Sequence, residues 1–185
     1  MVYTANTLLI KKGEGEITDS MVVKVRAAQL GGDFSIMEGE IDPDQLLAPH
    51  CHAHEDQVVF VIQGEIEFEV GGAGGERFTA SAGDYVIKPR GIPHAFWNKQ
   101  AQQVRYIELS GGRGFEQFTD STRFGAIKAG LKAKEDYGIE FFMDYALRLM
   151  KAHGLTSIRG IEMPWEQLEG NTPIDKLRAL VEKRG

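Results

Sequence analysis

The segment from residue 58 to residue 70 reads VVFVIQGEIEFEV, and its pattern restricts the fold more than any other part of the chain. Residues 58–62 are apolar at every position, which predicts a strand that is covered on both faces. After Gly64, glutamates alternate with apolar residues over 65–70, as in a strand with one buried face and one wet face. The connection is too short to contain a crossover helix, so the two strands are expected to run antiparallel.

Further short strands are predicted on both sides of this hairpin. Residues 22–25, 34–41, 83–88 and 104–109 are rich in β-branched or alternating apolar residues, and turns with Gly or Asp-Pro-Asp separate them. No connection has the length of a βαβ unit. Residues 1–112 are therefore expected to form one all-β domain, an antiparallel barrel or sandwich.

The sequence changes in character after this point, and residues 113–185 are expected to form a helical extension. Apolar residues between 139 and 150 follow helical spacing, and Gly154 stands where a C-terminal cap belongs. A second helix is predicted to begin at Thr172, which has the side chain of an N-cap. Both helices would pack on the outside of the barrel or across its mouth.

Three of the five histidines, His50, His52 and His54, occupy alternate positions in the stretch PHCHAHEDQ. Residues two apart on a strand point to the same side, so His50 and His52 can aim at one point inside a barrel. His94, arriving from another strand, would complete three sides of a metal site. Neutral imidazole suits most first-row divalent ions, so these ligands do not identify the metal.

The stretch around His94 reads GDYVIKPRGIPHAFWN over residues 83–98, with a spacing of glycine, proline, glycine and histidine that is rare by chance. This spacing resembles the second motif of the cupin superfamily. The first cupin motif is matched by His50, His52, Gln57 and Gly64, with glutamine in place of the usual acid. The flanking stretch GRGFEQF at 112–118 is most similar to single-domain cupins that are grouped with quercetin dioxygenases.

The resemblance implies a jelly-roll-like cupin barrel around one divalent metal ion, with His50, His52, Gln57 and His94 as ligands. A glutamine oxygen can bind a metal but carries no charge, so Gln57 would leave the full +2 on the ion. The same replacement removes a general base, so Gln57 is the ligand at which the catalytic chemistry is expected to depart from the family pattern.

Two further points stay open. If the chain remains extended after His52, His54 is an additional ligand, and the site then resembles that of some cupin polyketide cyclases. If a turn begins there, His54 is only a neighbour at the rim. Phe60 and Phe96 either line a pocket for an aromatic substrate or belong to the core.

Three functions are compatible with such a site. The favoured one is a metal-dependent dioxygenase that acts on an aromatic or enolisable small molecule. The alternatives are a non-oxidative cyclase or isomerase, in which the ion polarises a carbonyl, and a non-catalytic binding protein. The expected cofactor is one iron, manganese, nickel or cobalt ion, with zinc as an alternative.

The net charge of −6 argues against nucleic acids and anionic membranes as partners. No apolar run approaches the roughly 20 residues needed to cross a bilayer, and no signal peptide is recognisable at the start of the sequence. The single cysteine fits a reducing compartment. We therefore expect a cytoplasmic protein with a small-molecule substrate, and the apolar strand 58–62 predicts a homodimer packed sheet on sheet.

Overall fold

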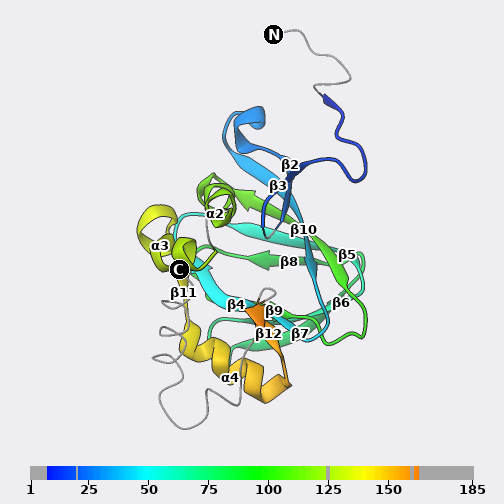
Figure 1. The fold of residues 1–185 in the computed structure, drawn as a ribbon, viewed down its shortest axis with the longest axis vertical. Coiled ribbons are helices and arrows are strands. Elements are labelled where there is room, and N and C mark those ends of the chain that lie inside the picture. Colours follow the sequence, from blue (N-terminus) through cyan, green and yellow to red (C-terminus); the bar gives the residue numbers. More distant parts are fainter. Residues whose placement is uncertain (1–7, 20, 124–125, 159–160, 163–185) are drawn as a thin grey trace.

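The computed structural model describes residues 8–19, 21–123, 126–158 and 161–162. Two sheets face each other and form a barrel, with helices at one end and along one side (Figure 1). The first sheet has the order β1 (Glu16–Ile17), β2 (Val22–Val25), β3 (Phe34–Ile41), β10 (Val104–Gly111), β5 (Gln57–Gln63) and β8 (Tyr85–Lys88).

The second sheet has the order β13 (Ile161–Glu162), β12 (Ser157–Ile158), β4 (Gln45–His52), β9 (His94–Trp97), β6 (Glu65–Val70) and β7 (Glu76–Ser81). A further strand, β11 (Ile139–Phe141), pairs with β4. The helical segments are η1 (Ala27–Leu30), α2 (Gly114–Thr122), α3 (Ala126–Tyr137) and α4 (Met143–His153). The predicted all-β antiparallel barrel with a helical C-terminal extension is confirmed.

The interior of the barrel has an apolar part and a polar part. Alternate residues of β5, β6, β9 and β10 point inward, which follows from the two-residue repeat of a strand. The apolar part is formed by a cluster of buried side chains that includes Val59, Val61, Ile66, Phe68, Phe96 and Tyr106. The buried polar residues on inward-facing positions include Gln57, Lys88, Glu108 and Ser110. Because burying polar groups is costly unless they are paired, this second group marks where function is to be sought.

The C-terminal extension is joined to the barrel by hydrogen-bonded strands. β11 pairs with the end of β4, and β12 runs parallel to its beginning. Helices α2 and α3 lie together at one end of the barrel, while α4 runs along the outside of the second sheet (Figure 1). The predicted helix between residues 139 and 150 begins later, at Met143, because Ile139 lies in β11. Gly154 caps α4 in the left-handed conformation (φ 61°), as expected.

The helix predicted from Thr172 lies outside the described residues. Within the described part of the chain, no helix has both the length and the apolar character needed to cross a membrane.

The wet face predicted for residues 65–70 is only partly correct. Glu65 is exposed, but Glu69 has no exposed surface. α4 covers this end of β6, and the Tyr145 hydroxyl of that helix donates a hydrogen bond to Glu69. Burial disfavours the charge of Glu69, yet hydrogen bonds from Tyr145, Gly74 and Arg77 outweigh this effect and lower its pKa. The carboxylate therefore joins the extension to the barrel.

Candidate metal centre

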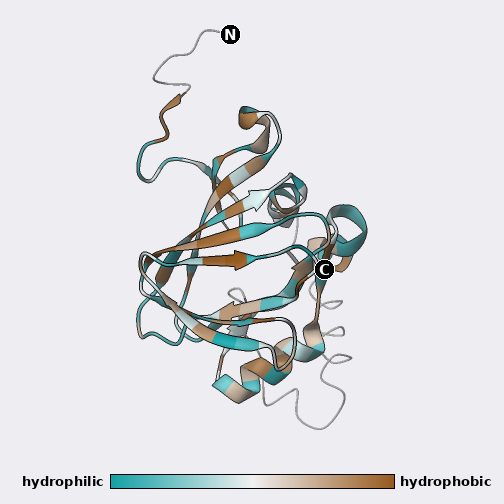
Figure 2. Cartoon of the chain, turned by 180° about the vertical axis from the view of Figure 1, so that it is seen from behind, coloured by the Kyte–Doolittle hydropathy of each residue, from teal (hydrophilic) through white to brown (hydrophobic). Residues whose placement is uncertain are grey.

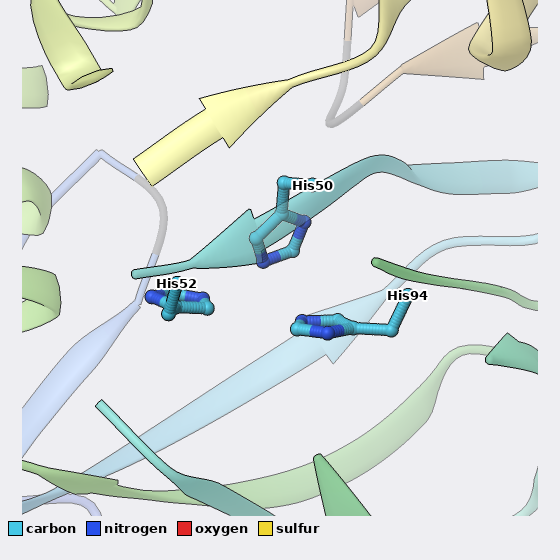
Figure 3. Close-up of side chains that lie close together, drawn as sticks. All are labelled: His50, His52 and His94. Atoms are coloured by element: carbon cyan, nitrogen blue, oxygen red, sulfur yellow. The ribbon is translucent and has the colours of Figure 1, made fainter. Parts of the chain in front are cut away.

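The structure brings His50, His52 and His94 together inside the barrel, with their imidazole rings facing one another (Figure 3). One nitrogen from each ring can be chosen so that all three lie within 4.8 Å of one another. The side chains are 8%, 2% and 1% exposed, respectively. Nitrogens that share one transition-metal ion lie about 3–4 Å apart, since each bond is about 2.1 Å long. The three rings are thus close to the spacing that a single ion requires.

A β-bulge in β4 directs two of these histidines into the barrel. Leu47 lies opposite Phe96 of β9, whereas His50 lies opposite His94, so the β4 side of the pair contains one extra residue. Without this residue, the alternation that places Leu47 inside would place His50 outside. The bulge therefore sets the orientation of both His50 and His52.

Backbone carbonyls fix the orientation of two of the rings. His50 Nδ1 lies 2.7 Å from the carbonyl oxygen of Ala48, and His94 Nδ1 lies 3.0 Å from that of Ile92. A carbonyl can only accept a hydrogen bond, so each Nδ1 carries the proton and each Nε2 presents a lone pair. His94 Nε2 and His52 Nε2 are buried and have no hydrogen-bond partner among the described residues. Buried nitrogens of this kind fit a metal ligand.

Burial and neighbouring charges favour the neutral imidazoles of His52 and His94. Burial holds the pKa of His52 well below its usual value, and the neighbouring His50 and Lys88 add to the effect. Burial likewise holds the pKa of His94 well below its usual value, with further contributions from His50, Lys88 and His52. Because only the neutral ring can bind a metal, protons compete weakly for this site.

Gln57 is the predicted fourth ligand, and its side chain points into the barrel from the start of β5. It is 1% exposed, and its Nε2 donates a hydrogen bond of 3.1 Å to Ser110 Oγ on the neighbouring strand β10. Its Oε1 is buried and has no hydrogen-bond partner in the described part of the chain. The amide oxygen is thus the atom of Gln57 that is left for an ion.

His54 lies outside the group of three clustered histidines, which favours the second of the two alternatives left open for it, a turn after His52. β4 ends at His52, and the chain turns through Ala53 and His54, both of which are exposed. The alternation that aligns His50 with His52 therefore stops before His54. His54 instead lines a surface hollow of about 360 Å³ between the end of β4, the start of α2 and the end of α3.

Of the two phenylalanines for which pocket lining and core packing were left open, Phe60 faces away from the barrel interior. It lies on the outer face of β5, where its ring is 4.6 Å from that of Tyr85, because Phe60 stands three positions after the inward-facing Gln57 and strand residues an odd number of positions apart point to opposite faces. Phe96 does point inward on the same face of β9 as His94, and it is 2% exposed. It packs against Phe68 with ring centroids 5.0 Å apart and belongs to the core.

Two aromatic side chains that could not be predicted from the sequence lie beside the histidines. The ring of Phe115, from α2, meets that of His52 edge-on at 5.3 Å. The ring of Phe141, from β11, lies 5.5 Å from that of His50. The C-terminal extension therefore supplies apolar walls to the candidate site. Phe115 lies within the stretch GRGFEQF, but nothing in that stretch shows that it returns to the histidines.

Glu55 was also missed as a residue of the site, although it stands between His52 and Gln57 in the sequence. It is 5% exposed, and its carboxylate accepts hydrogen bonds from the backbone N–H groups of Gly114 and Phe115 at the start of α2. Burial raises the pKa of Glu55, and these hydrogen bonds oppose that shift. Both of its oxygens accept hydrogen bonds, so the structure gives Glu55 the role of holding the start of α2 beside β5.

The glycines and the asparagine of the two motifs have structural roles. Gly64 and Gly91 adopt positive φ angles of 83° and 74°, which suit glycine. A Cβ at Gly64 would lie 2.6 Å from the side chain of Val104. Gly91 N donates a hydrogen bond of 2.7 Å to the carbonyl of His52, which ties the second motif to the first. Asn98 Nδ2 donates to two backbone carbonyls and is no part of the metal centre.

Comparison with known proteins supports this reading of the barrel. Residues 36–110 match the protein family described as the cupin domain. No curated protein matches the sequence.

Several solved structures are similar in shape to the chain. KdgF from Halomonas sp. shares 24% identity over 50% of this chain and 77% of its own, with a TM-score of 0.45. An uncharacterized protein with a double-stranded β-helix domain from Klebsiella pneumoniae shares 21% identity over 60% of this chain and 89% of its own, with a TM-score of 0.44. The DMSP lyase DddQ from Ruegeria pomeroyi shares 22% identity over 44% of this chain and 39% of its own, with a TM-score of 0.39.

Proposed function

We propose, from the premise that residues 36–110 are a cupin domain, that the barrel holds one divalent transition-metal ion and uses it to act on a small molecule. The ligands would be the imidazoles of His50, His52 and His94 and the Oε1 oxygen of Gln57. The observation that carries this proposal is the convergence of three buried imidazoles. Two of them have Nε2 atoms without a hydrogen-bond partner in the described residues. Buried polar nitrogens without a hydrogen-bond partner are costly, and a metal ion bound between the rings would satisfy them.

The most specific function that we propose is that of a dioxygenase for an aromatic or enolisable substrate. Iron, manganese, nickel or cobalt would supply a Lewis acid and a centre for O₂ activation. Phe115 and Phe141 would exclude water and hold the apolar part of the substrate against the histidines. In such a reaction both atoms of O₂ enter the product and the electrons come from the substrate, so no external reductant is needed.

One observation favours a second candidate, a non-oxidative cyclase or isomerase. Gln57 is neutral, so the ion would keep its full +2 charge and polarise a substrate carbonyl more strongly than beside a carboxylate. Glu55, the carboxylate whose Oε2 lies 3.9 Å from His52 Nδ1, accepts three hydrogen bonds from Ser110 and the start of α2, and we assign it to holding these groups in place. A reaction that relies on Lewis acidity alone suits this set of residues.

The experiment that tests the proposal is elemental analysis of protein purified without chelator or affinity metal, followed by turnover assays with and without O₂. About one equivalent of iron, manganese, nickel or cobalt together with O₂ uptake supports the dioxygenase. Metal-dependent turnover under strict anaerobiosis supports the cyclase or isomerase and contradicts the dioxygenase. If the protein neither contains a metal nor takes one up on reconstitution, the proposal is wrong.

We also propose that the protein is a homodimer that packs through the outer face of the first sheet. We call this surface the outer apolar face. Its members share outward positions on neighbouring strands, and they are Ile36, Leu109, Val58, Ile87, Ile107, Phe60 and Tyr85. Ile87 and Tyr85 are 70% and 66% exposed. In Figure 2, the brown colour of hydrophobic residues marks neighbouring strands of this sheet.

A second copy of the chain is the partner that best fits this surface. Two sheets can pack face to face about 10 Å apart, and a two-fold axis lets one apolar face cover its own copy. At one side of the face, Arg105 forms ion pairs with Glu38 and Glu40 on its own sheet, so the charges there are compensated without a partner. The apolar rows remain to be covered, which also accounts for the fully apolar strand 58–62.

Replacing Ile87 by Glu is expected to convert the dimer into a monomer, because a carboxylate would be buried in an apolar interface. Multi-angle light scattering at micromolar concentration measures the change. The matched control is Leu131→Glu on α3, since Leu131 is 73% exposed and lies outside the face. This control should stay dimeric. A wild-type protein that is monomeric under these conditions would contradict the proposal.

A further inference from the structure

A chain of buried hydrogen bonds connects Gln57 to the start of α2. Gln57 Nε2 donates to Ser110 Oγ at 3.1 Å, and Ser110 Oγ donates to Glu55 Oε2 at 3.3 Å. Phe115 N donates to the same Glu55 oxygen at 2.8 Å, and Gly114 N donates to the other one. Gln57 and Ser110 are each 1% exposed. Because these groups are buried, a hydrogen bond lost from this series is not readily replaced by one to water.

The direction of each hydrogen bond follows from the groups at the far end. Backbone N–H groups can only donate, so the carboxylate of Glu55 is held as an acceptor. Ser110 has one hydroxyl proton and gives it to Glu55 Oε2. The oxygen of Ser110 can then only accept the remaining hydrogen bond, and the group that faces it on Gln57 must be the NH₂ end of the amide.

We infer that Glu55 and Ser110 are positioning residues that fix the amide of Gln57 with its oxygen free for the metal. If the amide were turned over, Gln57 Oε1 would face the lone pairs of Ser110, and the NH₂ group would face the ion. The buried Oε1 without a hydrogen-bond partner in the described residues agrees with this orientation. The inference rests on the proposed metal site.

A glutamine ligand must be oriented so that its oxygen faces the ion, which a carboxylate ligand does not require. The two oxygens of a carboxylate are equivalent, so either of them can bind an ion after a half-turn of the group. An amide has one oxygen, and an error in its orientation places two N–H donors against a cation. Gln57 thus needs a partner that distinguishes its two ends, and Ser110, oriented by Glu55, is that partner. Outer residues that orient a ligand typically affect metal affinity by about 10–100-fold.

The test compares Ser110→Ala in two backgrounds, the wild-type protein and Gln57→Glu, with the apparent Kd for Co²⁺ measured by titration of its visible absorption. In the wild-type background we expect Ser110→Ala to raise the Kd by about 10–100-fold. In the Gln57→Glu background, where the ligand has two equivalent oxygens, the same substitution should change the Kd by less than about 3-fold. Gln57→Glu alone should bind Co²⁺ at least as tightly as the wild type.

Each outcome decides a different question. An equal loss of Co²⁺ affinity in the two backgrounds would show that Ser110 only supports the fold. No loss of affinity in either background would show that the amide of Gln57 needs no orienting partner. Both results overturn the inference and leave the proposed metal site intact. If the wild type and the Gln57→Glu variant both fail to bind Co²⁺, the proposed function itself is wrong. Circular dichroism and thermal unfolding of the metal-free variants establish that each one is folded.

Discussion

Replacing His94 by Ala is expected to lower the affinity of the protein for a divalent transition metal by more than about 100-fold. Residues that only orient a ligand change metal affinity by about 10–100-fold, and His94 would be a ligand itself. Its ring centroid lies 4.4 Å from that of His50 and 5.6 Å from that of His52, and both of these imidazoles would already be ligands, so the site would lose one of its three nitrogens. The metal content after purification and the Kd for Co²⁺ both measure the loss.

The matched control is His54→Ala, which removes a histidine from the same stretch of sequence. His54 is exposed, and it lines the surface hollow at the end of β4. Its removal is expected to leave the metal content and the Kd unchanged. A loss of metal in His54→Ala equal to that in His94→Ala would show that the chain after His52 joins the site. Retention of a full equivalent in His94→Ala would contradict the proposed ligand set.

Some strands could be predicted from the sequence with correct bounds, and others could not. β3 and β6 match the predicted ranges 34–41 and 65–70, because turn residues mark both ends of each strand. A strand that carries His94 was expected, but the bounds of β9 were not predicted, since a strand of four residues that is buried on both faces has no periodicity to detect. β7 was missed for another reason. It is mostly exposed, and no alternation of apolar and polar residues marks it.

The candidate site divides in the same way. The spacing of the two motifs was sufficient to select His50, His52 and His94, because it constrains residues that meet across neighbouring strands. The bulge before His50 could not be predicted from the sequence, and neither could the face of β5 on which Phe60 lies, because residues 58–62 are apolar at every position. The contribution of the extension could not be predicted. Phe115 and Phe141 reach the histidines through tertiary contacts, which a local pattern does not encode.

Replacing Lys88 by Met is expected to destabilise the protein by about 3–5 kcal/mol, because it leaves the carboxylate of Glu108 buried without its ammonium partner. Lys88 Nζ lies 2.8 Å from Glu108 Oε1 and 2.9 Å from Oε2, and the two side chains are 1% and 2% exposed. The ammonium also lies 5.1 Å from the centre of the Phe96 ring. Urea unfolding of metal-free protein measures the change in the free energy of unfolding.

The double variant Lys88→Met/Glu108→Leu shows whether the pair itself is needed. Two apolar side chains of similar volume remove both charges from the interior, and such replacements are often neutral or stabilising. We therefore expect the double variant to recover most of the stability that Lys88→Met loses. The two single substitutions then cannot be additive, since the cost of each comes from the charge that it leaves behind. If the double variant loses as much free energy of unfolding as Lys88→Met and Glu108→Leu lose together, this expectation is wrong, and each side chain stabilises the barrel independently. If the double variant recovers its stability but binds Co²⁺ much more weakly than the wild type, the ion pair supports the metal centre and not the fold.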